Sequence, residues 1–312
     1  MPILRLNATE EDLQLQGSAA SASWATRSAA RGNGPVIIMV HGFKYDPWHP
    51  AHNPHSSIFA AATHAQCPAD VHWPRHLGFG LGDPDEGLAI AFAWRARGNI
   101  WRAKRTATSA GRHLARAIRH VRSVAPRRPI HIVSHSMGSE VAFEAIEALP
   151  AGSIQRMISL TGASYQSRAE AALRSPCGRT VELFNVVSRE NDLFDFCFER
   201  LIAPEGPNDN AMSAGLSAPN ALTLQLDCPT SLDALKRFGG YLAQPQRRVC
   251  HWSGYTRPGA LRFYKQLLRQ PETIAFDAIK QALPRETSAR WSRIMPRPDF
   301  SWPVPDFRKT VS

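Results

Sequence analysis

The sequence lacks several features that would place it in a specialised class. It has no run of about 18 consecutive apolar residues, the minimum for a membrane-spanning helix. Residues 1–16 carry acidic side chains and no long apolar run, unlike a secretory signal. No internal repeat or long low-complexity tract is present. These absences predict a soluble globular protein without a transmembrane segment, and we expect it in the cytoplasm.

The cysteines and histidines do not show the spacing that is typical of a metal site. The five cysteines are scattered without short-range pairing, which fits reduced thiols (Cys67, Cys177, Cys197, Cys228 and Cys250). One loop, residues 43–59, holds three histidines at spacings of three: His49, His52 and His55. Pro50 and Pro54 interrupt any regular element that could align them on a metal. We therefore predict no metal and no cofactor, and expect this loop to form a wall of a substrate pocket.

The chain carries a formal net charge of +11, and much of it lies between Arg95 and Arg128. Arginine and lysine recur there at helical spacing, which favours the solvated face of an amphipathic helix. Contact with nucleic acid or another acidic surface is the alternative. No helix-turn-helix, zinc-finger or RNA-recognition motif supports that alternative, so we expect no nucleic-acid partner. The oligomeric state is left open.

Short apolar runs alternate with helical patterns along the chain. Runs rich in β-branched or apolar residues predict buried strands at residues 34–42, 88–94, 130–134, 157–160, 181–187 and 221–226. Helical spacing predicts helices at residues 99–124, 139–149 and 258–269. Such alternation is typical of an α/β protein, with a doubly wound, mostly parallel sheet flanked by helices.

Three regions follow from this pattern. Residues 1–33 are interpreted as an N-terminal extension, residues 34–283 as the α/β domain, and residues 284–312 as a C-terminal tail. A stretch rich in Pro, Gly and Asn, residues 203–219, predicts an irregular, lid-like excursion over the site.

The strongest functional signal is the segment Ser134-His135-Ser136-Met137-Gly138. It follows a predicted strand and precedes a predicted helix, so a sharp turn would expose Ser136 at the carboxyl edge of the sheet. The N–H groups at the start of that helix would favour a developing negative charge. Because a serine hydroxyl is a weak nucleophile alone, it needs a base and an oxyanion hole.

This segment resembles the G-x-S-x-G nucleophile elbow of the α/β-hydrolase superfamily, with Ser134 in place of the first glycine. The pair His41-Gly42 after an early strand is similar to the start of the superfamily's oxyanion loop. The resemblance implies that the backbone N–H groups of Phe43 and Met137 hold the oxyanion, and that His41 braces the loop. A plain strand-end turn with a buried histidine is the alternative.

Two further segments supply the rest of the implied triad. Asp192 follows the strand at residues 181–187, and His251 precedes a glycine-containing loop and a late helix. Their order, Ser136 then Asp192 then His251, is the order found in the superfamily. His251 would act as base, and Asp192 would orient it. Asp195 is the second candidate for the acid, ahead of Glu190, and a helix cap or turn acid is the alternative.

The resemblance to bacterial α/β-hydrolase-fold serine esterases implies cleavage of a small-molecule carboxylic ester. Four other side chains are predicted to lie near the substrate: His41, His135, Tyr45 and Trp252. Acyl transfer and thioester or amide cleavage could use the same triad, so they stay open. A catalytically silent binding protein of the same fold is a further alternative.

Overall fold

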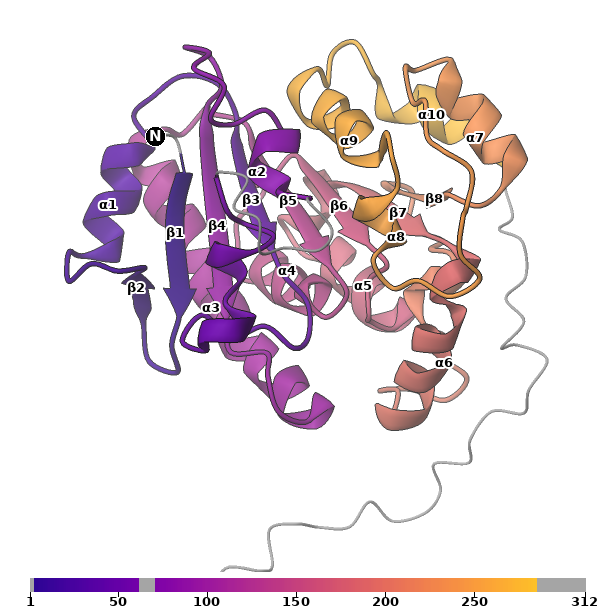
Figure 1. Cartoon of the computed structure of the whole chain (residues 1–312), viewed down its shortest axis with the longest axis horizontal. Coiled ribbons are helices and arrows are strands. Elements are labelled where there is room, and N and C mark those ends of the chain that lie inside the picture. Colours follow the sequence, from indigo (N-terminus) through magenta and orange to yellow (C-terminus); the bar gives the residue numbers. More distant parts are fainter. Residues whose placement is uncertain (1–2, 62–70, 285–312) are drawn as a thin grey trace, which may run out of the picture.

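The computed structural model describes residues 3–61 and 71–284 (Figure 1). In this part of the chain, one eight-stranded sheet runs in the order β2-β1-β4-β3-β5-β6-β7-β8. Only β2 is antiparallel to its neighbour, and all other paired strands are parallel. The strands are β1 (Ile3–Ala8), β2 (Leu13–Leu15), β3 (Val36–Val40), β4 (Leu88–Trp94), β5 (Ile130–His135), β6 (Arg156–Leu160), β7 (Glu182–Val187) and β8 (Ala221–Gln225). The predicted α/β fold is confirmed.

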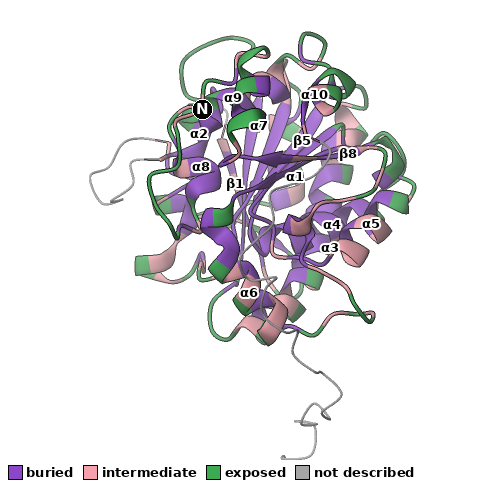
Figure 2. Cartoon of the chain, turned by 90° about the vertical axis from the view of Figure 1, so that its right-hand side faces the viewer, coloured by how far each residue is buried: buried purple, intermediate pink, exposed green. Residues whose placement is uncertain are grey.

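Helices cover both faces of the sheet. One face packs against α1 (Ala22–Ala29), α3 (Ile100–Val124), α4 (Gly138–Glu147) and α5 (Gln166–Arg174). The other packs against α2 (Trp73–His76), α7 (Pro229–Lys236), α8 (Ser253–Thr256), α9 (Ala260–Arg269) and α10 (Phe276–Ala282). Short 3-10 helices are η1 (Pro50–His52), η2 (Pro54–Ser56), η3 (Gly178–Thr180), η4 (Arg189–Asn191) and η5 (Met212–Ala214). Figure 2 shows the buried layer running through the sheet and the inner sides of these helices.

The central strands explain why the sheet has two cores. Every residue of β3 is fully buried, as expected of a parallel strand covered on both faces. Alternate side chains point to opposite faces. Val36, Ile38 and Val40 therefore pack with α3 and α4, whereas Ile37 and Met39 pack with α9.

The basic helix predicted at residues 99–124 is observed as α3. Its alanine-rich face is buried against the sheet and α4, while Arg102, Arg105, Arg112 and Arg119 are exposed. Asn99 caps its start by accepting from the Arg102 N–H, at 2.7 Å. No helix in the described residues is long and apolar enough to cross a membrane.

The N-terminal region differs from the expected extension. Strand β1 lies inside the sheet, paired in parallel with β4, and β2 forms the edge beside it. Polar residues interrupt the apolar pattern of β1, and one of them is buried: Asn7 is held by Gln16 and by His55 Nε2, at 2.7 Å. This bond also gives the loop histidine His55 a structural role.

Residues 203–219 are largely irregular, as predicted, and they are anchored to the body. The backbone N–H of Met212 donates to the carbonyl of Ser164, and Asn185 Nδ2 donates to the carbonyl of Met212. Met212 itself is fully buried. The predicted tail, apart from its first residue, lies outside the described residues.

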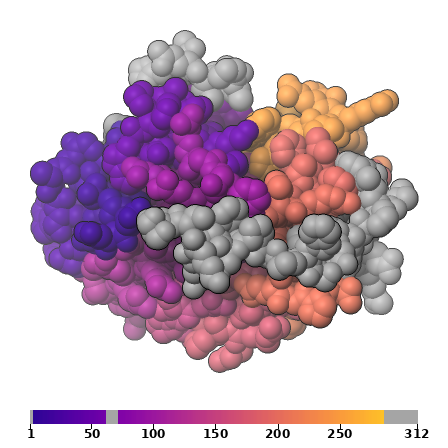
Figure 3. All heavy atoms as spheres, turned by 90° about the horizontal axis from the view of Figure 1, so that it is seen from below, coloured from indigo at the N-terminus to yellow at the C-terminus, as the bar shows by residue number. Residues whose placement is uncertain are grey.

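Strands β3, β5, β6 and β7 are parallel, so their carboxyl ends meet at one edge of the sheet. This edge faces downward in Figure 1, and Figure 3 views the molecule from that side. Helix α6 (Asp192–Leu201) follows β7 at this edge, and the indole N–H of Trp101 at the start of α3 donates to the Leu201 carbonyl. The predicted site residues are carried by the segments that leave this edge.

Candidate active site

Ser136 occupies the sharp turn between β5 and α4. Its φ of +52° is left-handed, a conformation that costs energy for a serine and that is typical of functional sites. Neighbouring backbone groups hold it there. The Ser136 N–H donates to the Leu160 carbonyl, and the Ser136 carbonyl accepts from the N–H groups of Ser139 and Ala163. The turn is therefore built into the sheet edge, as expected of a nucleophile elbow.

The turn tolerates a side chain at the first glycine position of the G-x-S-x-G pattern but not at the second. Ser134 replaces the first glycine, and its hydroxyl joins a buried chain with Ser139 (3.0 Å) and Ser159 (2.8 Å). This chain satisfies the extra hydroxyl, so serine is accommodated there. At Gly138, by contrast, an added Cβ would lie 2.6 Å from the His41 carbonyl oxygen. Helix α4 can begin this close to β3 only if that position has no side chain.

The loop after β3 passes directly against Ser136. A Cβ added to Gly42 would lie 2.7 Å from Ser136 Cβ. The next N–H, that of Phe43, and the N–H of Met137 after the nucleophile make no hydrogen bond to another protein group within the described residues. These two N–H groups, the ones that the sequence analysis assigned to an oxyanion hole, therefore have no competing acceptor among the described residues.

His41 braces this loop. The side chain is fully buried, Nδ1–H donates to the Gly42 carbonyl at 2.8 Å, and Nε2 accepts from the Trp94 N–H at 3.1 Å. Burial lowers the pKa of His41 to about 3, so the ring is neutral. Because both ring nitrogens are engaged by backbone, the geometry supports the bracing role and leaves no polar atom for a substrate.

His251 lies at the same edge, tied there by its main chain. Its carbonyl accepts from His135 Nε2 at 3.1 Å and from Thr161 Oγ1 at 3.2 Å. The His135 and His251 ring centroids are 4.6 Å apart, and His135 directly precedes Ser136. The His251 ring also stacks on Phe194 at 4.5 Å. The segment that carries His251 therefore contacts the residue directly before Ser136.

Within the described residues, the Ser136 hydroxyl and the His251 imidazole are not joined by a hydrogen bond. Catalytic hydrogen bonds are often long without substrate and tighten in the substrate complex. Burial, followed by the nearby His135 and Lys44, lowers the pKa of His251 well below its usual value. Burial also lowers the pKa of His135, to about 4. His251 is thus held in the neutral form that a general base requires.

The carboxylates predicted near His251 have separate surroundings. The side chain that meets His251 Nδ1 is that of Asn191, whose Oδ1 lies at 2.6 Å. Asp192, the predicted acid, is fully buried as the first residue of α6. Asp195, the second candidate, accepts from Asn191 Nδ2 at 3.0 Å. Glu190 forms a buried ion pair with Arg257.

A cavity of about 510 Å³ lies beside the loop that carries His251. Tyr45 and Trp252, both predicted to be near the substrate, line it. Its other apolar walls are formed by Ile58, Val71, Tyr255 and Pro258. His135 has a different position: it is buried, and its ring packs edge-on against Tyr255 at 5.1 Å. His135 thus packs against Tyr255 and does not line the cavity.

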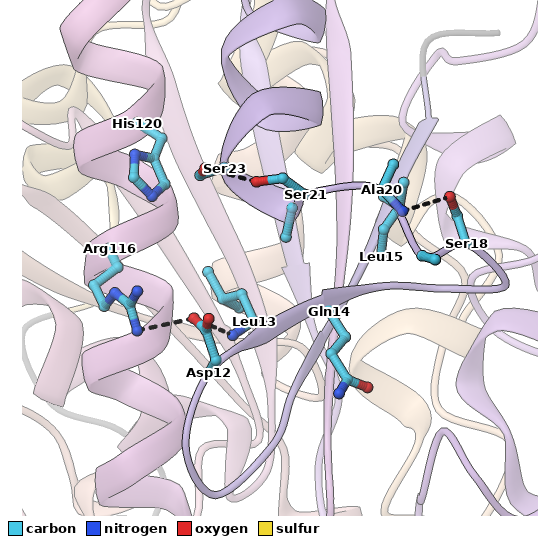
Figure 4. A pocket seen from close by; sticks show the side chains of 12 residues that line it. Asp12, Leu13, Gln14, Leu15, Ser18, Ala20, Ser21, Ser23, Arg116 and His120 are labelled. Carbon is cyan, nitrogen blue, oxygen red and sulfur yellow. Dashed lines mark hydrogen bonds and ion pairs between the residues drawn. The ribbon is translucent and has the colours of Figure 1, made fainter.

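A second cavity, of about 590 Å³, lies between β2, α1 and α3 (Figure 4). Its lining includes Arg116, which pairs with Asp12 at 3.0 Å, and His120. None of the predicted site residues reaches it. Among the described residues, no cluster of three or more His, Cys, Asp or Glu could hold a metal ion.

Comparisons with known proteins gave one family match and one similar solved structure. A family model described as alpha/beta hydrolase of unknown function (DUF900) matches residues 18–163, which include the oxyanion loop and the elbow. No curated protein matches the sequence. The solved acylaminoacyl peptidase of Pyrococcus horikoshii (orthorhombic crystal form) resembles 81% of the chain, with 13% identity and a TM-score of 0.36, and the chain spans 40% of that protein. Residues 18–163 are thus similar to an α/β-hydrolase family, and the mostly parallel sheet with helices on both faces is consistent with that fold.

Proposed function

We propose that the protein is a serine hydrolase that cleaves carboxylic esters, with Ser136 as nucleophile and His251 as base. The observation that carries the proposal is the placement of Ser136 in a left-handed turn, pressed against Gly42. The unused N–H groups of Phe43 and Met137 flank that turn. A strained serine between two such donors is the arrangement that acyl transfer requires.

The reaction would proceed in two halves. His251 Nε2 takes the proton of the Ser136 hydroxyl as its oxygen attacks the ester carbonyl, and the negative oxygen is bound by the Phe43 and Met137 N–H groups. The imidazolium then protonates the leaving alcohol, which leaves an acyl group on Ser136. Water, deprotonated by His251, attacks this acyl-enzyme and releases the acid, and Ser136 recovers its proton. In both halves, His251 accepts a proton from the attacking group and returns it to the leaving group.

The cavity beside His251 suggests the substrate class. Aromatic and aliphatic side chains, including Tyr45 and Trp252, form part of its walls, and polar and charged side chains form the rest. In small-molecule pockets the apolar side chains bind the apolar part of a ligand, and polar groups fix its orientation. We therefore propose an ester with an apolar acyl or aryl group, bound with that group against Tyr45 and Trp252.

Labelling with a fluorophosphonate probe followed by peptide mapping tests the nucleophile. The probe should modify the peptide that contains Ser136, and Ser136→Ala should abolish labelling and lower kcat by about 10⁶-fold. Ser123→Ala, a change on the exposed part of α3, is the matched control and should label like the wild type. Modification of a different peptide, or no modification, would contradict the site assignment.

A panel of p-nitrophenyl esters of increasing acyl length, with matching thioesters and amides, tests the reaction class. Esters should be cleaved fastest. Added acceptor alcohols should leave the yield of free acid unchanged if water is the acceptor. Formation of new esters would indicate an acyltransferase, and labelling without turnover of any substrate would indicate a binding protein.

A further inference from the structure

We propose that Asn191 positions His251 and is itself held by Asp195, so that the third member of the catalytic group is an amide backed by a carboxylate. This inference rests on the proposed function, because it concerns the residue that orients its base. Asn191 and Asp195 are each 2% exposed, so water competes little for their hydrogen bonds. Asp192, the acid predicted from the sequence, is the rival for this position.

The hydrogen bonds fix which nitrogen of His251 carries the proton. Asn191 Oδ1 lies 2.6 Å from His251 Nδ1, and an amide oxygen can only accept. Nδ1 must therefore be the donor, which leaves Nε2 unprotonated in the neutral ring. This is the tautomer that can take a proton from a serine hydroxyl.

The orientation of the Asn191 amide follows from Asp195. Asn191 Nδ2 lies 3.0 Å from Asp195 Oδ1, and an ionised carboxylate can only accept. The amide therefore turns its NH₂ group to Asp195 and its oxygen to His251, since the reverse orientation would set the amide oxygen against a carboxylate oxygen, and both atoms are acceptors. The two residues are four apart at the start of α6, so both side chains lie on one face of that helix.

An amide partner on His251 affects the pKa of this histidine, because the other groups around the ring already disfavour its protonated form. His135 on β5 and Lys44 on the oxyanion loop act on it, and both lower its pKa, as burial does. The Asp195 charge is one amide farther away, so it stabilises the imidazolium less than a directly bonded carboxylate would. His251 should therefore stay unprotonated, and active, at a lower pH than in a Ser–His–Asp site.

Four variants test the proposal, with ester hydrolysis as the assay and thermal unfolding to confirm that each variant is folded. Asn191→Ala should lower kcat by about 100-fold, with KM little changed, because the imidazole loses its orientation. Asp195→Ala should act in the same direction, whereas Asp195→Asn should retain most activity because its amide oxygen can still accept from Asn191. Cys197→Ser, on the exposed face of α6, is the control. Full activity of Asn191→Ala, together with loss in Asp192→Asn, would overturn the proposal in favour of Asp192.

The exchange variant Asn191→Asp/Asp195→Asn gives a readout that a purely structural role would not move. It keeps one amide and one carboxylate but places the carboxylate on His251 Nδ1. The acidic limb of the kcat/KM profile should then shift upward by about one to two pH units. A limb that stays at the wild-type pH would overturn the proposal.

Nitrogen NMR of histidine-labelled protein separates this inference from the hydrolase proposal. The wild type should show His251 with a protonated Nδ1 and an unprotonated Nε2, and Asn191→Ala should lose the hydrogen-bonded Nδ1 proton. This spectrum does not depend on turnover, so it supports the inference even if Ser136 fails to react with the probe. A His251 ring protonated on Nε2 would overturn it even if the protein hydrolyses esters.

Discussion

Gly42→Ala perturbs a close approach between the loop after β3 and Ser136. The new methyl group would lie 2.7 Å from Ser136 Cβ and 2.9 Å from the His135 carbonyl oxygen. Ordinary contact begins at 3.4 Å, so the loop and the serine must separate by about 0.7 Å (3.4 − 2.7). The His135 oxygen is a backbone atom and Ser136 Cβ is bonded directly to the backbone, so neither can yield as a flexible side-chain end can.

This displacement lies between the Ser136 hydroxyl and the Phe43 N–H that would bind the oxyanion. A misplacement of about 1 Å can cost about 100-fold in rate, or about 2.7 kcal/mol of transition-state stabilisation. We expect Gly42→Ala to lower kcat/KM by about that factor and to destabilise the fold by about 1–3 kcal/mol.

Ester hydrolysis and the rate of fluorophosphonate labelling measure the effect, with thermal unfolding to confirm folding. Gly206→Ala is the matched control, because a Cβ there meets nothing within 4 Å. A folded Gly42→Ala protein with wild-type rates in both assays would refute the reasoning, since it would mean that the oxyanion loop does not depend on this contact.

Two further predictions concern buried charge. His131→Leu should stabilise the protein more at pH 5.0 than at pH 7.5: neither ring nitrogen of His131 has a partner in the described residues, and burial lowers its pKa to about 3. Because this folded-state pKa lies below the unfolded value of about 6.5, the histidine destabilises the fold progressively as the pH falls from 6.5 to 3. The cost is about 2 kcal/mol at pH 5. Equal shifts of the urea midpoint at both pH values would contradict this prediction. Arg257→Met should cost about 3–5 kcal/mol in thermal unfolding by leaving Glu190 charged and buried, and Glu190→Gln in the same protein should recover part of the loss. An unchanged Tm would count against the pairing.

The sequence predicted the parts of the fold that periodicity and local turn chemistry control. Strands buried on both faces are continuous apolar runs, so β3, β4 and β5 were visible directly. The elbow was visible because a strand, a small-residue turn and a helix follow one another within a few residues. In contrast, β1 was missed because polar residues break its pattern, and Asn7 is satisfied by distant partners.

The partner of His251 could not be predicted with the same precision. The segment after β7 contains Asn191 and the nearby carboxylates Asp192 and Asp195, and the resemblance favoured the carboxylate at position 192. Which side chain faces the histidine depends on where the turn η4 ends and α6 begins, at residues 191 and 192. A shift of one residue turns a helical side chain by about 100°. Sequence spacing does not resolve that difference.

Hydrogen bonds from the carboxyl edge of the sheet fix the position of the loop that carries His251, although this loop is distant from those strands in the sequence. The main chain near His251 is tied to three neighbouring strands: its own carbonyl to His135 at the end of β5 and to Thr161 after β6, and the Cys250 N–H to the Glu190 carbonyl after β7. Thr161 adopts a φ of +43°, a costly conformation that the surrounding bonds sustain. Since parallel strands fix their carboxyl ends relative to one another, these ties place the imidazole relative to Ser136 more tightly than the loop alone could. The same edge thus positions the His251 imidazole and holds Ser136 in its left-handed turn.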